Sequence, residues 1–343
     1  MNKFLITLVA AMSLLVANIA SADVKITGMT GALASMGDKV DGGITSKFNR
    51  FQFTADATMD NGWTYSGFFA TEIKAAGTRS FALPTSNGVT VGTGMATISI
   101  GNVADAVTSL VPRIGAMIPG GGHDAGYQFL YGGDSALGAG GPGQVRFAEA
   151  YYAYNAARIN VALPTLNGFS VSASYTPAMD MNDGASNARV NNPNSGRHGE
   201  TSHVAVAYSG EMDGMSYTLG LGSITGNSEG NAVDTTVATK DNNDLSVFTA
   251  ALKVSMGNIT VGAGIAHQEK TMGTRAATDS TAGAGVAGNV YEDSITMVGV
   301  GYNMGGGVNS FIQYNSGTTT DGNHATVTDK DPSVLSMGIT LGF

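Results

Sequence analysis

The sequence predicts an all-β protein, a transmembrane antiparallel up-and-down β-barrel, on three observations. Apolar and small polar residues alternate strictly along many short segments, which is the period of a strand with two different faces. The polar face carries Ser, Thr, Gly and Asn but few Lys or Glu, which suits an enclosed lumen better than a water-exposed wall. Short and long links alternate along the chain, as they do when tight turns gather at one end of a barrel and long loops at the other.

The first five strands are expected at 24–36, 46–59, 63–73, 87–92 and 95–101. In the second of them, Phe51 and Phe53 belong to an apolar set that alternates with polar residues. Asp60-Asn61-Gly62 is a turn signal before the third strand, and Thr93-Gly94 separates the fourth from the fifth.

The other nine strands follow the same rule. Four are expected at 157–163, 168–176, 201–209 and 215–224, with short links at 164–168 and 210–214. Five more are expected at 245–256, 259–268, 291–304, 308–316 and 333–343, with short links at 257–258 and 305–307. The residues therefore indicate fourteen strands, an even number that leaves both termini at one end of the barrel.

Composition excludes several other classes of protein. The chain of 343 residues has no Cys, which excludes disulfides, thiolate metal sites and a thiol nucleophile. Its 49 Gly follow no G-X-Y period, so it is not collagen-like. The formal net charge of -9 argues against nucleic acid as a partner.

The N-terminus reads as a signal peptide at residues 1–22, expected to be cleaved. Lys3 precedes an apolar run over residues 4–17, which is too short to span a bilayer, and Ala20-Ser21-Ala22 is a small-residue cleavage site. Residues 23–343 then form a single barrel domain, and no later stretch is apolar enough for a transmembrane helix.

Several segments resemble Gram-negative general-diffusion porins, and most closely the alphaproteobacterial branch. They are KFNRFQFTADATMDNGWTYSGFFATE at 47–72, VTVGTGMATISIGN at 89–102, NAARINVALPTLNGFSVSASY at 155–175 and the terminal SMGITLGF. The resemblance implies sixteen strands, which we favour over the fourteen counted, and a homotrimer. It also implies that the third external loop folds into the lumen and that the closing strand, with Leu341 and Phe343, carries the assembly signal.

Residues 103–146 form the longest link and are the expected counterpart of that pore-constricting loop. The segment is rich in Gly, which permits sharp bends in a confined space. Its interspersed aromatic residues, among them Tyr127, Phe129 and Tyr131, favour packing against a wall over free solvation.

Charged residues at the constriction are assigned by strand parity, because a lipid-facing Arg or Lys at mid-depth costs about 2–4 kcal/mol. The basic candidates are Arg50, which matches a constriction Arg of the family, Arg158 and Lys253. The acidic candidates are Asp105, Asp124, Asp134, Glu72 and Glu149. Facing rows of opposite charge would favour small polar solutes. The alternative is that the basic residues bind backbone carbonyls and the acids are solvated.

Metal and catalytic signals are weak. Asp180, Asn182 and Asp183 form the best oxygen-ligand cluster, but the spacing of an EF-hand is missing, so we expect diffuse Ca²⁺ bridging at external acidic loops and no cofactor. No common hydrolase or nucleotide motif is present. His203 could serve an esterase only with a Ser that nothing local identifies.

The sequence thus predicts a non-enzymatic, passive channel for small hydrophilic solutes and ions in the outer membrane of a Gram-negative bacterium. The alternatives are a substrate-selective channel of the same architecture and a structural or receptor barrel without an open pore. The expected partners are further copies of the chain, outer-membrane lipid and lipopolysaccharide, the outer-membrane assembly machinery and the solutes themselves.

Overall fold

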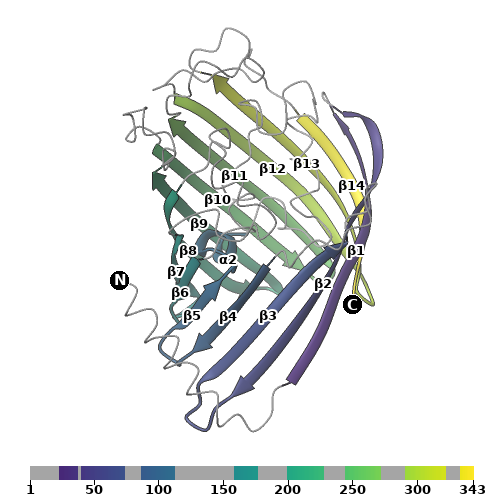
Figure 1. The fold of residues 1–343 in the computed structure, drawn as a ribbon. Coiled ribbons are helices and arrows are strands. Elements are labelled where there is room, and N and C mark those ends of the chain that lie inside the picture. The colour runs from purple at the N-terminus through teal and green to yellow at the C-terminus, as the bar shows by residue number, and fades with distance from the viewer. Residues whose placement is uncertain are drawn as a thin grey trace.

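The computed structural model describes residues 23–37, 40–73, 86–112, 158–176, 199–227, 244–271, 290–321 and 333–343, and these form a closed antiparallel barrel (Figure 1). The strands, each bonded to its neighbours in chain order, are β1 Asp23–Gly37, β2 Val40–Thr58, β3 Thr64–Ile73, β4 Ser86–Gly92, β5 Thr97–Gly101, β6 Arg158–Ala162, β7 Phe169–Thr176, β8 Gly199–Met212, β9 Met215–Asn227, β10 Asp244–Met256, β11 Ile259–Thr271, β12 Val290–Gly305, β13 Val308–Asp321 and β14 Ser333–Gly342.

The described barrel has fourteen strands, which confirms the count made from the residues and corrects the sixteen favoured from the resemblance. Strand β1 pairs with both β2 and β14, so the ladder closes on itself. Strand β5 pairs directly with β6, from Thr97 opposite Ala162 to Gly101 opposite Arg158. The long link between these two strands therefore leaves and returns on neighbouring strands, and no further strand fits between them.

One boundary differs clearly from expectation. The expected strands at 24–36 and 46–59 leave a long link between them, but β2 already begins at Val40, whose Cα partner on β1 is Gly37. The pairing of β1 with β2 is irregular, with register shifts at Met29/Gly31 in the middle of β1 and at Ser35/Gly37 near this end, where the alternation pattern is weak. Backbone pairing thus extends beyond the part of the strand that side-chain periodicity reveals.

The two faces of the wall are the reverse of those of a water-soluble protein. Large apolar side chains such as Val204, Leu252 and Ile265 are 56%, 42% and 49% exposed on the outside. Polar side chains such as Arg158 and Gln313 lie inward and are 2% and 1% exposed. This arrangement fits a barrel surrounded by lipid. Among the described residues, no helix is long and apolar enough to cross a membrane.

Tight turns connect neighbouring strands at one end of the barrel. Asp213 and Gly214 both have positive φ, 51° and 78°, and form the two-residue link between β8 and β9 that suits the twist of a hairpin. The rings of Phe169 and Tyr208 lie 4.7 Å apart near this end, and those of Tyr208 and Tyr217 lie 5.9 Å apart. Such aromatic residues mark the boundary of the apolar band.

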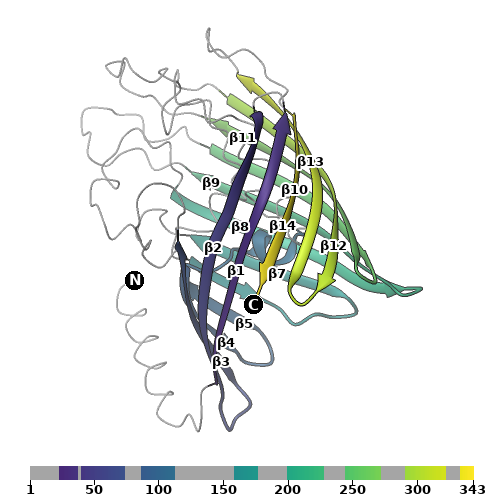
Figure 2. The same cartoon turned by 90° about the vertical axis from the view of Figure 1, so that its right-hand side faces the viewer.

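The wall is uneven in height (Figure 2). Strands β5 and β6 have five residues each, whereas β12 has 16. A short helix, α2 (Ala106–Leu110), follows β5, and both views show it inside the ring of strands (Figure 1, Figure 2).

Candidate functional site

The segment 102–112 turns from the end of β5 into the lumen and lies against the inner face of the wall. Helix α2 contacts β6, β7, β8 and β9. Ala106, Val107 and Val111 are buried on this side, between 0% and 3% exposed, and Val103, 4% exposed, lies over Gly88 of β4. This segment is the described beginning of the loop expected to constrict the pore.

Asp105 starts α2 as its N-cap residue. One carboxylate oxygen, Oδ1, accepts the backbone N–H of Thr108 at 2.9 Å, and Oδ2 accepts the Thr108 hydroxyl at 2.7 Å. The hydroxyl of Ser109 donates to the Asp105 carbonyl oxygen at 2.6 Å. The sequence Asp-Ala-Val-Thr-Ser begins a helix here because Asp satisfies a backbone donor that a first turn leaves unpaired.

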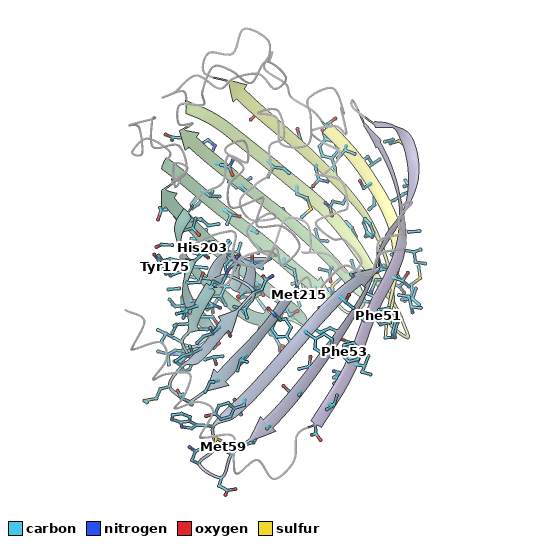
Figure 3. The ribbon with its side chains drawn as sticks, in the orientation of Figure 1. Phe51, Phe53, Met59, Tyr175, His203 and Met215 are labelled. Atoms are coloured by element: carbon cyan, nitrogen blue, oxygen red, sulfur yellow. The ribbon has the colours of Figure 1, made fainter. Side chains whose placement is uncertain are left out.

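The same carboxylate meets two basic side chains of the wall. Arg158 on β6 donates from Nη1 to Oδ2 at 3.2 Å, and Nδ1 of His203 on β8 lies 3.3 Å from Oδ1. All three side chains are fully buried. On its other side, His203 Nε2 lies 3.0 Å from the hydroxyl oxygen of Thr201. Figure 3 labels His203, which comes from the strand next to that of Tyr175.

The electrostatics keep Asp105 ionised in spite of its burial. Desolvation opposes the charged form, but the hydrogen bond and charge of His203, the charge of Arg158 and the Thr108 N–H outweigh it. The pKa of Asp105 therefore lies well below its usual range. Removing one partner of such a buried ion pair typically costs about 3–5 kcal/mol.

The wall is shaped to receive the segment. A Cβ at Gly220 would lie 2.7 Å from Pro112 Cδ and from Val111 Cα, and one at Gly222 would lie 2.9 Å from both methyl carbons of Val107. These two glycines of β9 form a flat floor that any side chain would disturb. The Ala106 N–H adds a hydrogen bond of 3.0 Å to the hydroxyl oxygen of Ser174 on β7.

Of the expected constriction residues, the structure brings Asp105 and Arg158 together. They form a buried pair and do not line the open path, since Asp105 is 0% and Arg158 is 2% exposed. Lys253 lies half-buried on the inward parity of β10, with Thr218 and Gly262 as Cα partners. No ion pair of Lys253 occurs within the described residues.

Arg50 and Glu72 are direct Cα partners on β2 and β3, but their side chains lie outside the described part of the structure. Asp124, Asp134 and Glu149 also lie outside the described residues, as do the three candidate calcium ligands Asp180, Asn182 and Asp183. Within the described ranges, no group of three or more His, Cys, Asp or Glu side chains is placed to hold a metal ion.

Sequence reasoning missed the role of His203, Ser174 and Thr201. The available signal was parity: Thr201 and His203 share a face with Ala205 and Ala207, and all four are buried. That face is the inner one, so a His there points into the lumen. The pattern does not reveal which lumenal group the His meets.

The end of the chain completes the barrel at the opposite seam. The Phe343 N–H donates to the Gly28 carbonyl oxygen at 3.0 Å, and the Gly28 N–H donates to the Phe343 carbonyl oxygen at 2.7 Å. The Phe343 ring lies over Gly28, where a Cβ would collide with it, and meets the Phe51 ring edge-on at a centroid distance of 5.9 Å. Leu341 and Phe343 are 42% and 62% exposed on the outer face.

Comparisons with known proteins found a matching family and similar solved structures. The family model described as Gram-negative porin matches residues 7–340. An anion-selective porin from Comamonas acidovorans is 12% identical, with a TM-score of 0.53, and the alignment covers 94% of this chain and 100% of that one. A porin structure refined at 1.8 Å resolution is 17% identical, with a TM-score of 0.52 and the same coverage. A search of curated proteins found no match.

Proposed function

The chain belongs to the Gram-negative porin family, and we propose that the lumen beside its inward segment is the path by which small hydrophilic solutes and ions diffuse through it. The protein is a passive diffusion channel of the Gram-negative outer membrane. The finer proposal concerns which part of the molecule limits that path: segment 102–112, on the wall of β6–β9.

This proposal rests on the arrangement of the wall, which is apolar outside and polar inside and holds the segment 102–112 against its inner face. Apolar side chains cover the outside, so the outer wall suits lipid. Hydroxyl pairs line the inner parity of neighbouring strands, such as Thr90 with Ser99 at 2.9 Å and Ser255 with Thr260 at 2.9 Å. A polar lumen of this kind admits water and hydrated solutes.

We propose that the channel has no enzymatic activity and needs no cofactor. Thr201, His203 and Asp105 do follow the order of a hydroxyl–imidazole–carboxylate triad. However, all three residues are 0% exposed, and the carboxylate is shared with Arg158. A substrate carbonyl has no access to the Thr201 hydroxyl, so the arrangement serves docking. An active-site fluorophosphonate probe should leave the folded barrel unlabelled.

We also propose that the protein assembles as a homotrimer through the outer face of β1–β5. That face carries a hollow of about 600 Å³ with mainly apolar lining, including Val24, Phe53, Phe69 and Val89. The Phe53 and Phe69 rings stack with centroids 4.6 Å apart and remain accessible from outside. A broad apolar face beside a short wall suits a subunit contact as well as lipid.

Conductance across a planar bilayer tests the channel function. The purified protein should produce stable ohmic steps in KCl, and liposomes that contain it should swell in small sugars but not in large dextrans. Boiled protein is the matched control. A folded, inserted barrel that passes neither ions nor sugars would support the closed structural barrel instead. Saturation by one solute class would support a selective channel.

A further inference from the structure

We propose that Asp105, Arg158 and His203 form a buried clamp that positions the inward segment and so determines the bore of the pore. The clamp consists of these three side chains, with Arg158 and His203 as positioning residues on the wall. The proposal rests on the channel function proposed above and names the contact on which its narrowest section depends.

The clamp joins parts of the chain that are distant in sequence. Asp105 belongs to the inward segment, whereas Arg158 and His203 belong to β6 and β8. Both oxygens of the carboxylate are engaged by the wall, Oδ2 by Arg158 at 3.2 Å and Oδ1 by His203 at 3.3 Å. Because the contacts come from two strands, they limit both rotation and sliding of α2 over the wall.

The other contacts of the segment are less selective. The floor at Gly220 and Gly222 gives close packing with Val107 and Pro112, but apolar packing has no preferred direction. One hydrogen bond, from the Ala106 N–H to the Ser174 hydroxyl oxygen, is directional but involves no charged group. The register of the segment on the wall therefore depends chiefly on the charged contacts.

Burial makes the clamp sensitive to the loss of the Asp105 charge. Arg158 and His203 are 2% and 0% exposed, so loss of the Asp105 charge leaves cationic or strongly polar groups away from water. Such groups regain water most readily when the segment that covers them moves away. Asp105 and Arg158 are both buried and lie out of the path, so loss of their contact should act on the bore more than on ion selectivity.

The test uses the absence of cysteine from the natural chain, which makes an introduced pair unique. A Cβ at Gly222 would lie 2.9 Å from both Val107 methyl carbons, which places Val107→Cys and Gly222→Cys within disulfide reach. This tether fastens the segment to β9 without involving the clamp. Disulfide formation is read as a mobility shift on a gel and needs no conductance measurement.

Four proteins are compared: the natural chain and Asp105→Asn, each with and without the cysteine pair. Asp105→Asn without cysteines should conduct about twofold more and fluctuate more, because ion flow follows the open cross-section. In the cysteine background, Asp105→Asn should slow disulfide formation. Once the disulfide has formed, conductance should return to that of the oxidised pair with Asp105 intact, and reductant should reverse the effect.

Controls separate position from charge and from folding. Asp56→Asn removes the same charge from the inward parity of β2, where Asp56 is exposed, and should leave disulfide formation unchanged. Only protein that shows the heat-dependent mobility of a folded barrel is measured. If Asp105→Asn does not fold, His203→Ala, which removes one clamp partner, takes its place.

The proposal is overturned if Asp105→Asn forms the disulfide and conducts like the natural chain. It is also overturned if conductance changes but the oxidised tether does not restore it, because the effect would then not be positional. If the natural chain does not conduct, while disulfide formation in the cysteine-pair background depends on Asp105, the channel function is refuted and the clamp stands.

Discussion

The Asp105 carboxylate combines two tasks that are usually separate. It caps α2 through the Thr108 N–H and hydroxyl, and it pairs with Arg158 of the wall and lies 3.3 Å from His203. The cap determines where the helix begins, and the charge determines where it docks. A carboxylate with this many donors remains ionised although its side chain is fully buried.

The acid sensitivity of the barrel should report this residue. A group whose pKa is lowered by folding contributes stability above its unfolded value, and this contribution is lost as pH falls through the folded value. The pKa of Asp105 is lowered from an ordinary 3.8. Its contribution should be complete above about pH 5 and decline below about pH 4. The unfolding temperature in detergent, followed by gel mobility at each pH, measures this.

The matched control is Asp105→Asn, which should lack this part of the acid dependence. The difference in unfolding temperature between the two proteins should therefore shrink as pH falls. A gap of constant size down to the lowest pH at which both are folded would contradict the prediction.

Arg50 should influence ion selectivity by its charge. It is expected at the constriction, and the backbone places it opposite Glu72. Arg50→Ala should shift the reversal potential in a KCl gradient toward cations and raise conductance slightly, because a bulky cation leaves the path. Measurement at low salt gives the largest effect. Arg50→Lys, which keeps the charge, should remain near the natural value, and an unchanged potential in Arg50→Ala would place the residue elsewhere.

At the scale of the element, β14 and β1 show how the barrel is completed. Phe343 and Gly28 exchange two backbone hydrogen bonds, one in each direction. The Phe343 ring occupies the space that a side chain at position 28 would need. The Phe51 ring packs edge-on against the Phe343 ring. The terminal Phe thus contributes to the seam of the folded barrel as well as carrying the proposed assembly signal.

Deleting Phe343 should lower the yield of folded barrel in the outer membrane while export to the periplasm continues, because both the signal and the last rung of the seam are lost. Fractionation and gel mobility measure the two steps. Gly28→Val is the informative companion, since it crowds the ring but leaves the terminal residue in place. It should weaken heat resistance and leave delivery to the membrane intact. Normal yield after the deletion would contradict the assembly role.

At the scale of the whole molecule, the apolar outside and the closed ladder explain how a chain with many polar groups resides in lipid. Every described strand has two bonded neighbours, so no strand edge of the described barrel faces the bilayer. The short strands β4, β5 and β6 leave part of the wall low, next to the apolar hollow of β1–β5.

We expect this part of the outer face to be a subunit contact. Unheated protein in SDS should migrate as an oligomer and boiled protein as a monomer. Phe69→Asp, which places a charge on the outer face beside Phe53, should weaken the oligomer, whereas Leu252→Asp on β10 should impair insertion without a specific effect on assembly. Native mass spectrometry in mild detergent that shows only monomers would refute the trimer.

The sequence by itself determined the strands and their faces. Period-two alternation is a local property, so all fourteen strands, the inward parity of Arg158 and Lys253 and the outward parity of Leu341 and Phe343 could be predicted from neighbouring residues alone. The resemblance correctly indicated the family, but it suggested two strands more than the described barrel contains.

Only the tertiary structure decided that the ring closes without a further strand between β5 and β6, and what Asp105 meets. Closure depends on the bonding of β5 to β6 across the longest link, and no residue within the link reveals it. Asp105 and Arg158 are 53 positions apart, and His203 lies on another strand still. Parity gives a side chain its face, but its partner on that face depends on where a distant segment docks. The buried clamp therefore arises from packing, which local periodicity does not encode.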